Sequence, residues 1–84
     1  SMKTEEIERF ALLKLEEFLA RPVSTEDLDM DYASLGADSM DVIVLTFELE
    51  ERLGVEIDPE FFFQYDNLRQ ALTAALELQP ASGS

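Results

Sequence analysis

Apolar residues recur at helical spacing in the first quarter of the chain. Thr4 suits an N-cap, and Glu5 and Glu6 would then lie at the positive end of the helix dipole. The apolar side chains that share one helical face are Ile7, Phe10, Ala11, Leu15, Phe18 and Leu19. Because proline cannot continue a helix, Pro22 predicts that this first helix ends near Ala20.

The next segment, residues 21–38, has no sustained period and is rich in Pro, Ser, Thr, Asp and Gly, which is typical of a loop. A loop of this length in a small domain is usually functional or disordered. Apolar residues recur within it and would pin it to a core, which favours an ordered, functional loop: Val23, Leu28, Tyr32 and Leu35.

A second helical pattern covers residues 39–53 and stops before Gly54, a residue type common just past a helix C-terminus. Its broad apolar side comprises Val42, Ile43, Leu45, Leu49 and Leu53. Met40, Val44 and Phe47 lie off that side. A helix with apolar residues beyond one face is either unusually buried or presents them to a partner.

Two shorter patterns complete the chain. Residues 59–63 suit a short third helix, because Pro59 fits a first helical turn. Asn67 suits an N-cap and forms a capping-box-like pair with Gln70. An amphipathic stripe follows and is closed by Pro80: Leu68, Ala71, Leu72, Ala75 and Leu76. The chain therefore predicts an all-α domain over residues 3–79, with residues 80–84 as a disordered tail.

The composition of the chain excludes several classes of function. The chain has 84 residues, a net charge of −13 and no His, Cys or Trp. It can form no disulfide or thiolate zinc site, and it lacks the usual general base. Such an acidic surface repels nucleic acids and anionic lipid and attracts proteins with basic patches. The apolar runs are too short for a membrane span, and no secretion signal is visible. We expect a monomeric cytoplasmic protein that binds neither nucleic acid nor membranes.

Ser39 stands where the long loop meets the second helix. Gly36 permits a tight turn before it, so that Ser39 lies at a helix N-terminus, where free N–H groups favour an anion. From position alone, Ser39 or Asp38 is most simply an N-cap. Ser39 is not a self-activating nucleophile, because no His is available to activate it.

The segment Leu35-Gly36-Ala37-Asp38-Ser39-Met40 resembles the phosphopantetheine attachment motif of acyl carrier proteins, whose usual form is Gly-x-Asp-Ser-Leu. The resemblance extends over roughly residues 4–78 and includes the helix order and the acidity. It implies a small four-helix bundle of the acyl-carrier type, which acts as a carrier and not as an enzyme. Ser39 would accept 4′-phosphopantetheine from coenzyme A, and the thiol of that group would hold an acyl thioester. Gly36, Asp38 and Met40 would complete the motif.

The resemblance also implies partners: a phosphopantetheinyl transferase and acyl-processing enzymes, such as ketosynthases, that carry basic docking patches. The second helix would meet them with Met40, Asp41, Val44, Phe47, Glu48 and Glu51. Fatty-acid carriers usually have an acidic residue where this chain has Val44. This difference, together with Asp66-Asn67-Leu68-Arg69, favours polyketide or related secondary metabolism over fatty-acid synthesis.

Other interpretations remain open at this point. Within the family, the alternative is a peptidyl or aminoacyl carrier of non-ribosomal peptide synthesis. Those carriers more often contain Gly-Gly-x-Ser-Leu and are less acidic. Outside the family, the alternatives are an acidic protein-binding or calcium-binding module, and a small hydrolase, which the lack of His disfavours.

Two motifs bear on these alternatives. Asp27-x-Asp29-x-Asp31 matches the first ligand positions of a calcium loop, but Tyr32 and Asp38 stand where that loop needs Gly and Glu, so we predict no metal site. The run Phe61-Phe62-Phe63 would either line an acyl-chain pocket or fill the core, and core packing is favoured.

Overall fold

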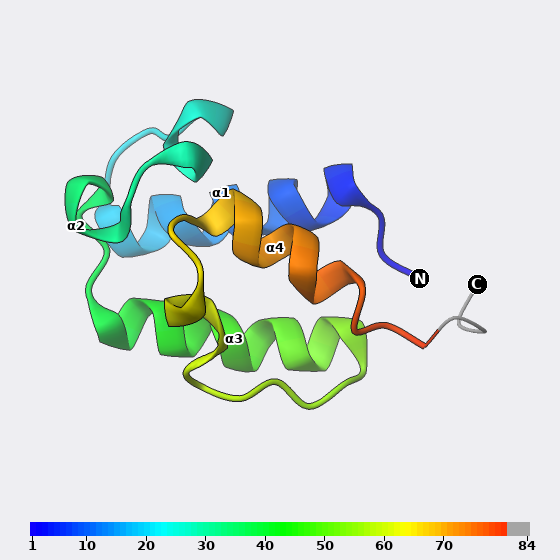
Figure 1. The fold of residues 1–84 in the computed structure, drawn as a ribbon. Helices are drawn as coiled ribbons and strands as arrows, with labels where there is room; N and C mark the ends of the chain where they lie inside the picture. The colour runs from blue at the N-terminus through cyan, green and yellow to red at the C-terminus, as the bar shows by residue number, and fades with distance from the viewer. Residues whose placement is uncertain (81–84) are drawn as a thin grey trace.

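The computed structural model describes residues 1–80, and the regular elements of that part are all helical (Figure 1). The α-helices are α1 (Thr4–Leu19), α2 (Tyr32–Leu35), α3 (Ser39–Leu53) and α4 (Leu68–Leu76). Two 3₁₀ helices join them, η1 (Thr25–Asp29) and η2 (Phe61–Gln64). Within residues 1–80 no strand forms, and the one β-type contact is an isolated bridge between Asp31 and Asn67. The predicted all-α bundle of the acyl-carrier type is confirmed.

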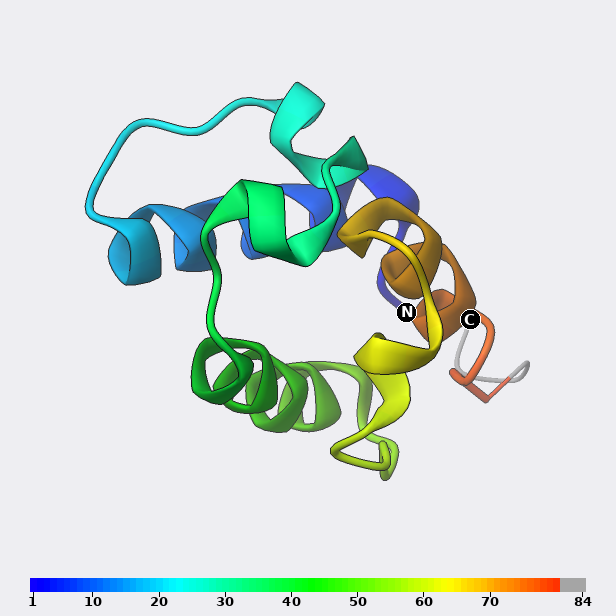
Figure 2. The ribbon, with the colours of Figure 1, turned by 60° about the vertical axis from the view of Figure 1, so that its left-hand side comes forward.

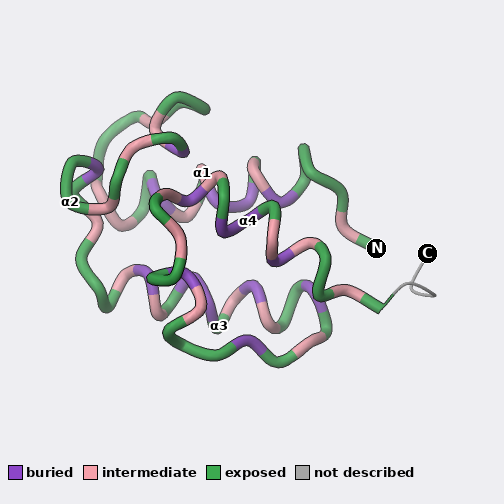
Figure 3. Tube along the Cα trace, in the orientation of Figure 1, coloured by how far each residue is buried: buried purple, intermediate pink, exposed green. Residues whose placement is uncertain are grey.

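Helix α1 packs against both α3 and α4, and α4 also contacts η1 and η2 (Figure 1). The buried positions of the three long helices face one another across a single core (Figure 3). The fully buried large side chains include Ile7, Leu15, Leu28, Leu45, Leu49, Phe62, Leu68 and Leu72. Every residue of the stripes predicted for α1 and α4 is either buried or packed against this core.

Helix α3 has the predicted ends, since Ser39 is its first residue and Leu53 its last. Gly54 follows in the left-handed conformation at φ 71°. The prediction for the apolar side is wrong at one position, because Ile43 is half-buried and lies outside the core cluster. Thr46 is fully buried in its place, and its hydroxyl donates to the Val42 carbonyl at 2.9 Å. Burial therefore leaves no polar atom of Thr46 unsatisfied.

The long connection between α1 and α3 is more regular than its sequence predicts, because it contains η1 and α2. Each short element is capped by a local carboxylate. Asp27 Oδ2 accepts from the Ser24 amide at 2.8 Å, and Asp31 Oδ2 accepts from the Ser34 amide at 3.1 Å. These single turns are too short to show a 3.6-residue period. The predicted apolar anchors all pack in or against the core: Val23, Leu28, Tyr32 and Leu35.

The N-cap of α1 is Lys3 and not the predicted Thr4, because the Glu6 carboxylate reaches back and accepts from the Lys3 amide at 3.0 Å. The third predicted helix is the 3₁₀ helix η2, which starts two residues later than expected.

The predicted cap of α4 is confirmed, since Asn67 Oδ1 accepts from the Gln70 amide at 2.9 Å. The Gln70 side chain accepts from Asp66 at 3.4 Å, one residue before the position that a capping box uses. Of the predicted disordered tail, only Pro80 lies within the described residues. No helix of residues 1–80 has the length and apolar character needed to cross a membrane.

Candidate carrier site at the start of α3

Ser39 is the exposed first residue of α3, and its two acidic neighbours cap the helix. The Asp38 carboxylate accepts from the Asp41 amide at 2.9 Å, and the Asp41 carboxylate accepts from the Asp38 amide at 3.4 Å. The N-cap is thus Asp38, and the Ser39 hydroxyl makes no hydrogen bond within residues 1–80. The capping requirement of α3 is met without Ser39, which leaves that hydroxyl available for chemistry.

Gly36 produces the turn that leads into this site. It ends α2 at φ 93°, a left-handed conformation that favours glycine, and its amide donates to the Tyr32 carbonyl at 3.1 Å. Only Ala37 and Asp38 then separate α2 from α3, and Figure 2 shows this short connection turning into the first turn of α3. The position of Ser39 relative to the core is therefore set by the turn at Gly36.

An exposed row of apolar side chains runs along α3 away from Ser39. Met40 is 62% exposed, Val44 38% and Phe47 52%, and their spacing of four and then three residues places them on one side of the helix. We call these three residues the apolar strip. The sequence predicted that they lie off the buried side, and the structure confirms this placement.

Most of the acidic side chains near the strip already make contacts within the domain. Asp38 and Asp41 cap the helix, and Glu48 Oε1 lies 3.0 Å from Lys14 Nζ of α1. The hydrogen bond to Glu48 raises the pKa of Lys14 above its ordinary value, so that this ammonium group stays charged. Glu51 alone of the four predicted acids is exposed with no side-chain partner among the described residues.

The interior near the start of α3 contains little empty space. A cavity of about 10 Å³ lies between the helices, and its lining is Leu15, Phe18, Ala37, Asp41, Val42, Leu45 and Leu68. This volume is at the lower limit for one water molecule.

None of the three consecutive phenylalanines lines this cavity. Phe62 is fully buried in the core, whereas Phe61 packs against Phe62 and Tyr65, and Phe63 forms a T-shaped contact with Tyr32. The favoured interpretation of this run as core is confirmed for Phe62. The alternative, that the run lines an acyl-chain pocket beneath the short helix, stays a prediction for Phe61 and Phe63.

The three aspartates of the calcium-like pattern serve separate contacts. Asp27 caps η1 and pairs with Arg21, Asp31 caps α2, and Asp29 pairs with Arg69. Hydrogen bonds to the Ser24 amide and to Ser34 lower the pKa values of Asp27 and Asp31, respectively. Across residues 1–80, no group of three or more acidic, His or Cys side chains is arranged to hold a metal ion.

Two contacts near the site could not be predicted from the local sequence pattern. The Tyr32 hydroxyl donates to the Phe62 carbonyl at 2.8 Å and joins α2 to η2, and burial raises the pKa of Tyr32 to about 12. Arg69 joins α4 to η1 and α1 through Asp29 and Glu8. Both contacts hold the segment that leads to Ser39. Their partners lie 30 to 61 residues apart, beyond the reach of any periodicity argument.

A family model described as "Phosphopantetheine attachment site" matches residues 13–75 of the chain. The matched segment contains the turn at Gly36, the cap at Asp38 and all of α3. The chain belongs to the family of phosphopantetheine-binding carrier domains. The expected kinship with acyl carrier proteins is thereby confirmed. Comparison with the curated proteins and with the solved structures gives no match.

Membership of this family assigns the prosthetic group, because its members attach 4′-phosphopantetheine. The protein is therefore a phosphopantetheine-carrying carrier domain. Such domains perform no catalysis themselves, and they interact with a phosphopantetheinyl transferase and with acyl-processing enzymes.

Proposed function

We propose that Ser39 carries the 4′-phosphopantetheine group and that the protein holds acyl intermediates as thioesters while separate biosynthetic enzymes process them. The observation that carries this proposal is the division of roles at the start of α3. Asp38 caps the helix, and the exposed Ser39 hydroxyl beside it has no hydrogen-bond partner within residues 1–80. A transferase therefore meets a hydroxyl that is accessible and whose removal from solvent breaks no internal contact.

The residues around Ser39 fit the group. When bound, it supplies the thiol that this cysteine-free chain lacks. The free N–H groups in the first turn of α3 favour the negative charge of a phosphodiester on Ser39. The turn at Gly36 and the mutual caps of Asp38 and Asp41 hold that first turn in place. The chain has no His to take the Ser39 proton, so the transferase must provide the base for the attachment.

We further propose that partner enzymes dock on α3 through the apolar strip, together with Asp41, Glu48 and Glu51. The exposure of Met40, Val44 and Phe47 supports apolar contact at the centre of the interface. The net charge of −13 supports rapid encounter with basic patches on the partners. The carrier would act as a monomer and perform no chemistry unaided.

Two features support polyketide or related secondary metabolism as the setting. The outward side of α3 bears three exposed apolar residues, with Val44 where fatty-acid carriers usually have an acid. The cavity of about 10 Å³ offers no room for a long alkyl chain, which favours cargo held outside the core. Both features concern selectivity, and the attachment at Ser39 does not depend on them.

Intact-mass measurement tests the attachment. The apo protein is incubated with coenzyme A and a broad-specificity phosphopantetheinyl transferase, and we expect an increase by the mass of one phosphopantetheinyl group. Ser39→Ala should abolish the increase. Ser34→Ala is the matched control because Ser34 is the nearest other serine, on α2, and this variant should be modified normally. A folded protein that gains no mass, or a Ser39→Ala variant that still gains it, would overturn the proposal.

A further inference from the structure

Cations gather at the seam between α1 and α3 in a chain that has few of them. The sequence contains 6 Lys and Arg against 19 Asp and Glu. Three of the six lie at this seam: Lys14 Nζ is 5.8 Å and Arg52 Cζ is 4.6 Å from the centre of the Phe10 ring, and Arg9 lies beside that ring in the same hollow. Half of the Lys and Arg side chains of this acidic protein therefore lie at one seam.

The two arginines of the seam keep their hydrogen-bond donors free. Lys14 pairs with Glu48, but within residues 1–80 neither Arg9 nor Arg52 pairs with a carboxylate. A guanidinium held against an aromatic ring by a cation–π contact keeps N–H groups available at its rim. Phe10 thus positions Arg52, while the N–H donors of the Arg52 guanidinium fork stay available to an incoming carboxylate.

Apolar surface lies next to these donors. Leu13 is 57% exposed, and a hollow of about 180 Å³ runs between it and Arg52, lined by Met2, Glu6, Arg9, Phe10, Leu13 and Arg52. Glu6 is the one acid among these lining residues, and its Oε1 accepts from the Lys3 amide at 3.0 Å. We call this hollow the α1–α3 groove.

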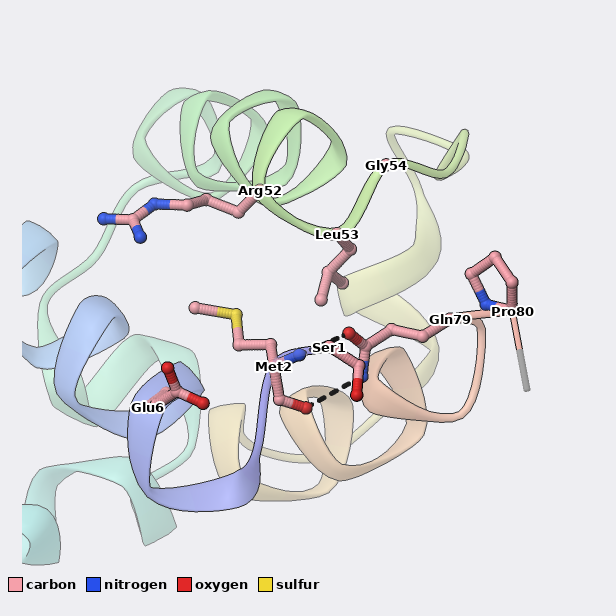
Figure 4. Close-up of a pocket in the computed structure, with 8 residues that line it drawn as sticks. All are labelled: Ser1, Met2, Glu6, Arg52, Leu53, Gly54, Gln79 and Pro80. Carbon is pink, nitrogen blue, oxygen red and sulfur yellow. Dashed lines mark hydrogen bonds between the residues drawn. The ribbon is translucent and has the colours of Figure 1, made fainter. Parts of the chain in front are cut away.

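The groove continues toward the N-terminal segment and the residues that follow α4. A second hollow of about 490 Å³ shares Met2, Glu6 and Arg52 with it (Figure 4). Gln79 forms the wall there, because its side chain accepts from the Met2 amide at 2.7 Å and donates to the Met2 carbonyl at 2.9 Å. These two bonds join the N-terminal segment to the residues that follow α4, so the wall is built by specific contacts.

We propose that the α1–α3 groove is a second docking surface and that it binds a partner-protein segment presenting one carboxylate beside an aliphatic side chain. The arginine fork matches a carboxylate, and Leu13 with Met2 offers apolar contact to the neighbouring side chain. The net charge of −13 repels polyacidic tracts at long range, so the occupant carries a single acid within a largely apolar segment.

This surface is separate from the proposed attachment site. Arg52 is thirteen residues after Ser39 on the same helix, which is about 20 Å along its axis. A segment bound in the groove therefore leaves Ser39 and the near end of the apolar strip accessible. The proposal does not depend on modification of Ser39, and each can fail without the other.

Nuclear magnetic resonance titration of the 84-residue protein tests the groove. The probe is the blocked dipeptide N-acetyl-leucyl-glutamate amide, and the matched neutral probe is N-acetyl-leucyl-glutamine amide. We expect saturable shifts in the Leu13 methyl groups and in the side-chain Nε–Hε signals of Arg9 and Arg52. The glutamate probe should bind several-fold more tightly than the glutamine probe, because only glutamate offers the arginines a carboxylate.

Variants separate this groove from other binding modes. The double variant Arg9→Gln/Arg52→Gln should lose the preference for glutamate, whereas Arg21→Gln, which lies on the connection after α1, should keep it. Arg52→Lys retains charge but not the fork, and should bind more weakly than the parent protein. Absence of saturable shifts, equal binding of both probes, shifts centred on the apolar strip, or association of two copies would each overturn the proposal.

Discussion

The Nε atom of Arg69 in α4 lies 2.6 Å from Oδ1 of Asp29 in η1. The same guanidinium reaches Glu8 of α1 at 2.9 Å and the Thr25 carbonyl at 3.0 Å. One side chain therefore ties the first half of the long connection to two helices. Because that connection leads to α2 and the turn at Gly36, Arg69 helps to hold the segment that positions Ser39.

Replacing Arg69 with Ala should lower the free energy of unfolding by about 1 kcal/mol, since a partly exposed charge network is worth little more than this. Arg69→Lys should retain part of the stability, because one ammonium group cannot make all three contacts. Urea unfolding monitored by circular dichroism measures both changes. Arg21→Ala, which breaks a single 3.4 Å pair, is the control and should cost less. Equal losses for the two Ala variants would show that the network adds nothing.

Tyr32 should make stability depend on pH at the alkaline end. Burial raises its pKa to about 12 in the folded protein, whereas an unfolded tyrosine titrates near 10. The pKa of Tyr32 is higher in the folded protein than in the unfolded chain. The contribution of Tyr32 to the free energy of unfolding is therefore complete below pH about 10 and is lost as the pH rises toward 12. Ionisation also removes the proton that the hydroxyl donates to the Phe62 carbonyl.

The variant Tyr32→Phe isolates this contribution. It keeps a ring next to Phe63 but removes the hydroxyl that donates to the Phe62 carbonyl, which still accepts from the Tyr65 amide at 3.2 Å. Loss of this hydroxyl bond should cost about 1 kcal/mol at neutral pH. Its stability curve should lose the part of the decline between pH 10 and 12 that Tyr32 causes. Tyr65→Phe is the control, because the Tyr65 hydroxyl makes no hydrogen bond within residues 1–80. Parallel curves for Tyr32→Phe and the parent protein would contradict the assignment.

Asp38 offers a way to separate helix capping from recognition. Asp38→Ala removes the acceptor for the Asp41 amide and should lower stability by about 1 kcal/mol. Asp38→Asn keeps an acceptor and should lose little, because asparagine caps helices nearly as well. The initial rate of phosphopantetheine transfer is then compared. If Asp38 acts by capping alone, Asn restores the rate; a rate that stays low in a stable Asn variant would indicate contact between the carboxylate and the transferase.

Substitution of Val44 tests whether partner enzymes dock on the apolar strip. Because Val44 is 38% exposed, Val44→Glu should change the midpoint of urea unfolding only slightly. The variant should weaken acceptance by enzymes that bind the strip through apolar contacts, measured as kcat/KM for acyl transfer from the loaded carrier. Thr73→Glu, an exposed position on α4, is the control and should leave transfer unchanged. Loss of folding in Val44→Glu would contradict the proposed exposure, and unchanged transfer would contradict the docking role.

Local signals in the sequence determined most of the helix ends and pointed to Ser39 as the proposed attachment site. Ser39–Leu53 follows from a cap at one end and Gly54 at the other, and Asn67 marks the start of α4. These signals are readable because capping and amphipathic contacts join residues only three or four positions apart. The motif around Ser39 is equally local, which is why the carrier family is recognisable before any fold is known.

Only tertiary packing decided the exceptions to the predicted core and the partners of the charged side chains. It buried Thr46 and left Ile43 half-exposed, because a hydroxyl bonded to its own helix can be buried without an unsatisfied polar atom. It also joined Glu48 to Lys14 and placed Arg52 over Phe10, pairs whose members are over thirty residues apart. Such contacts depend on how whole helices pack. The distribution of charge around α3, and with it the α1–α3 groove, therefore exists only in the folded chain.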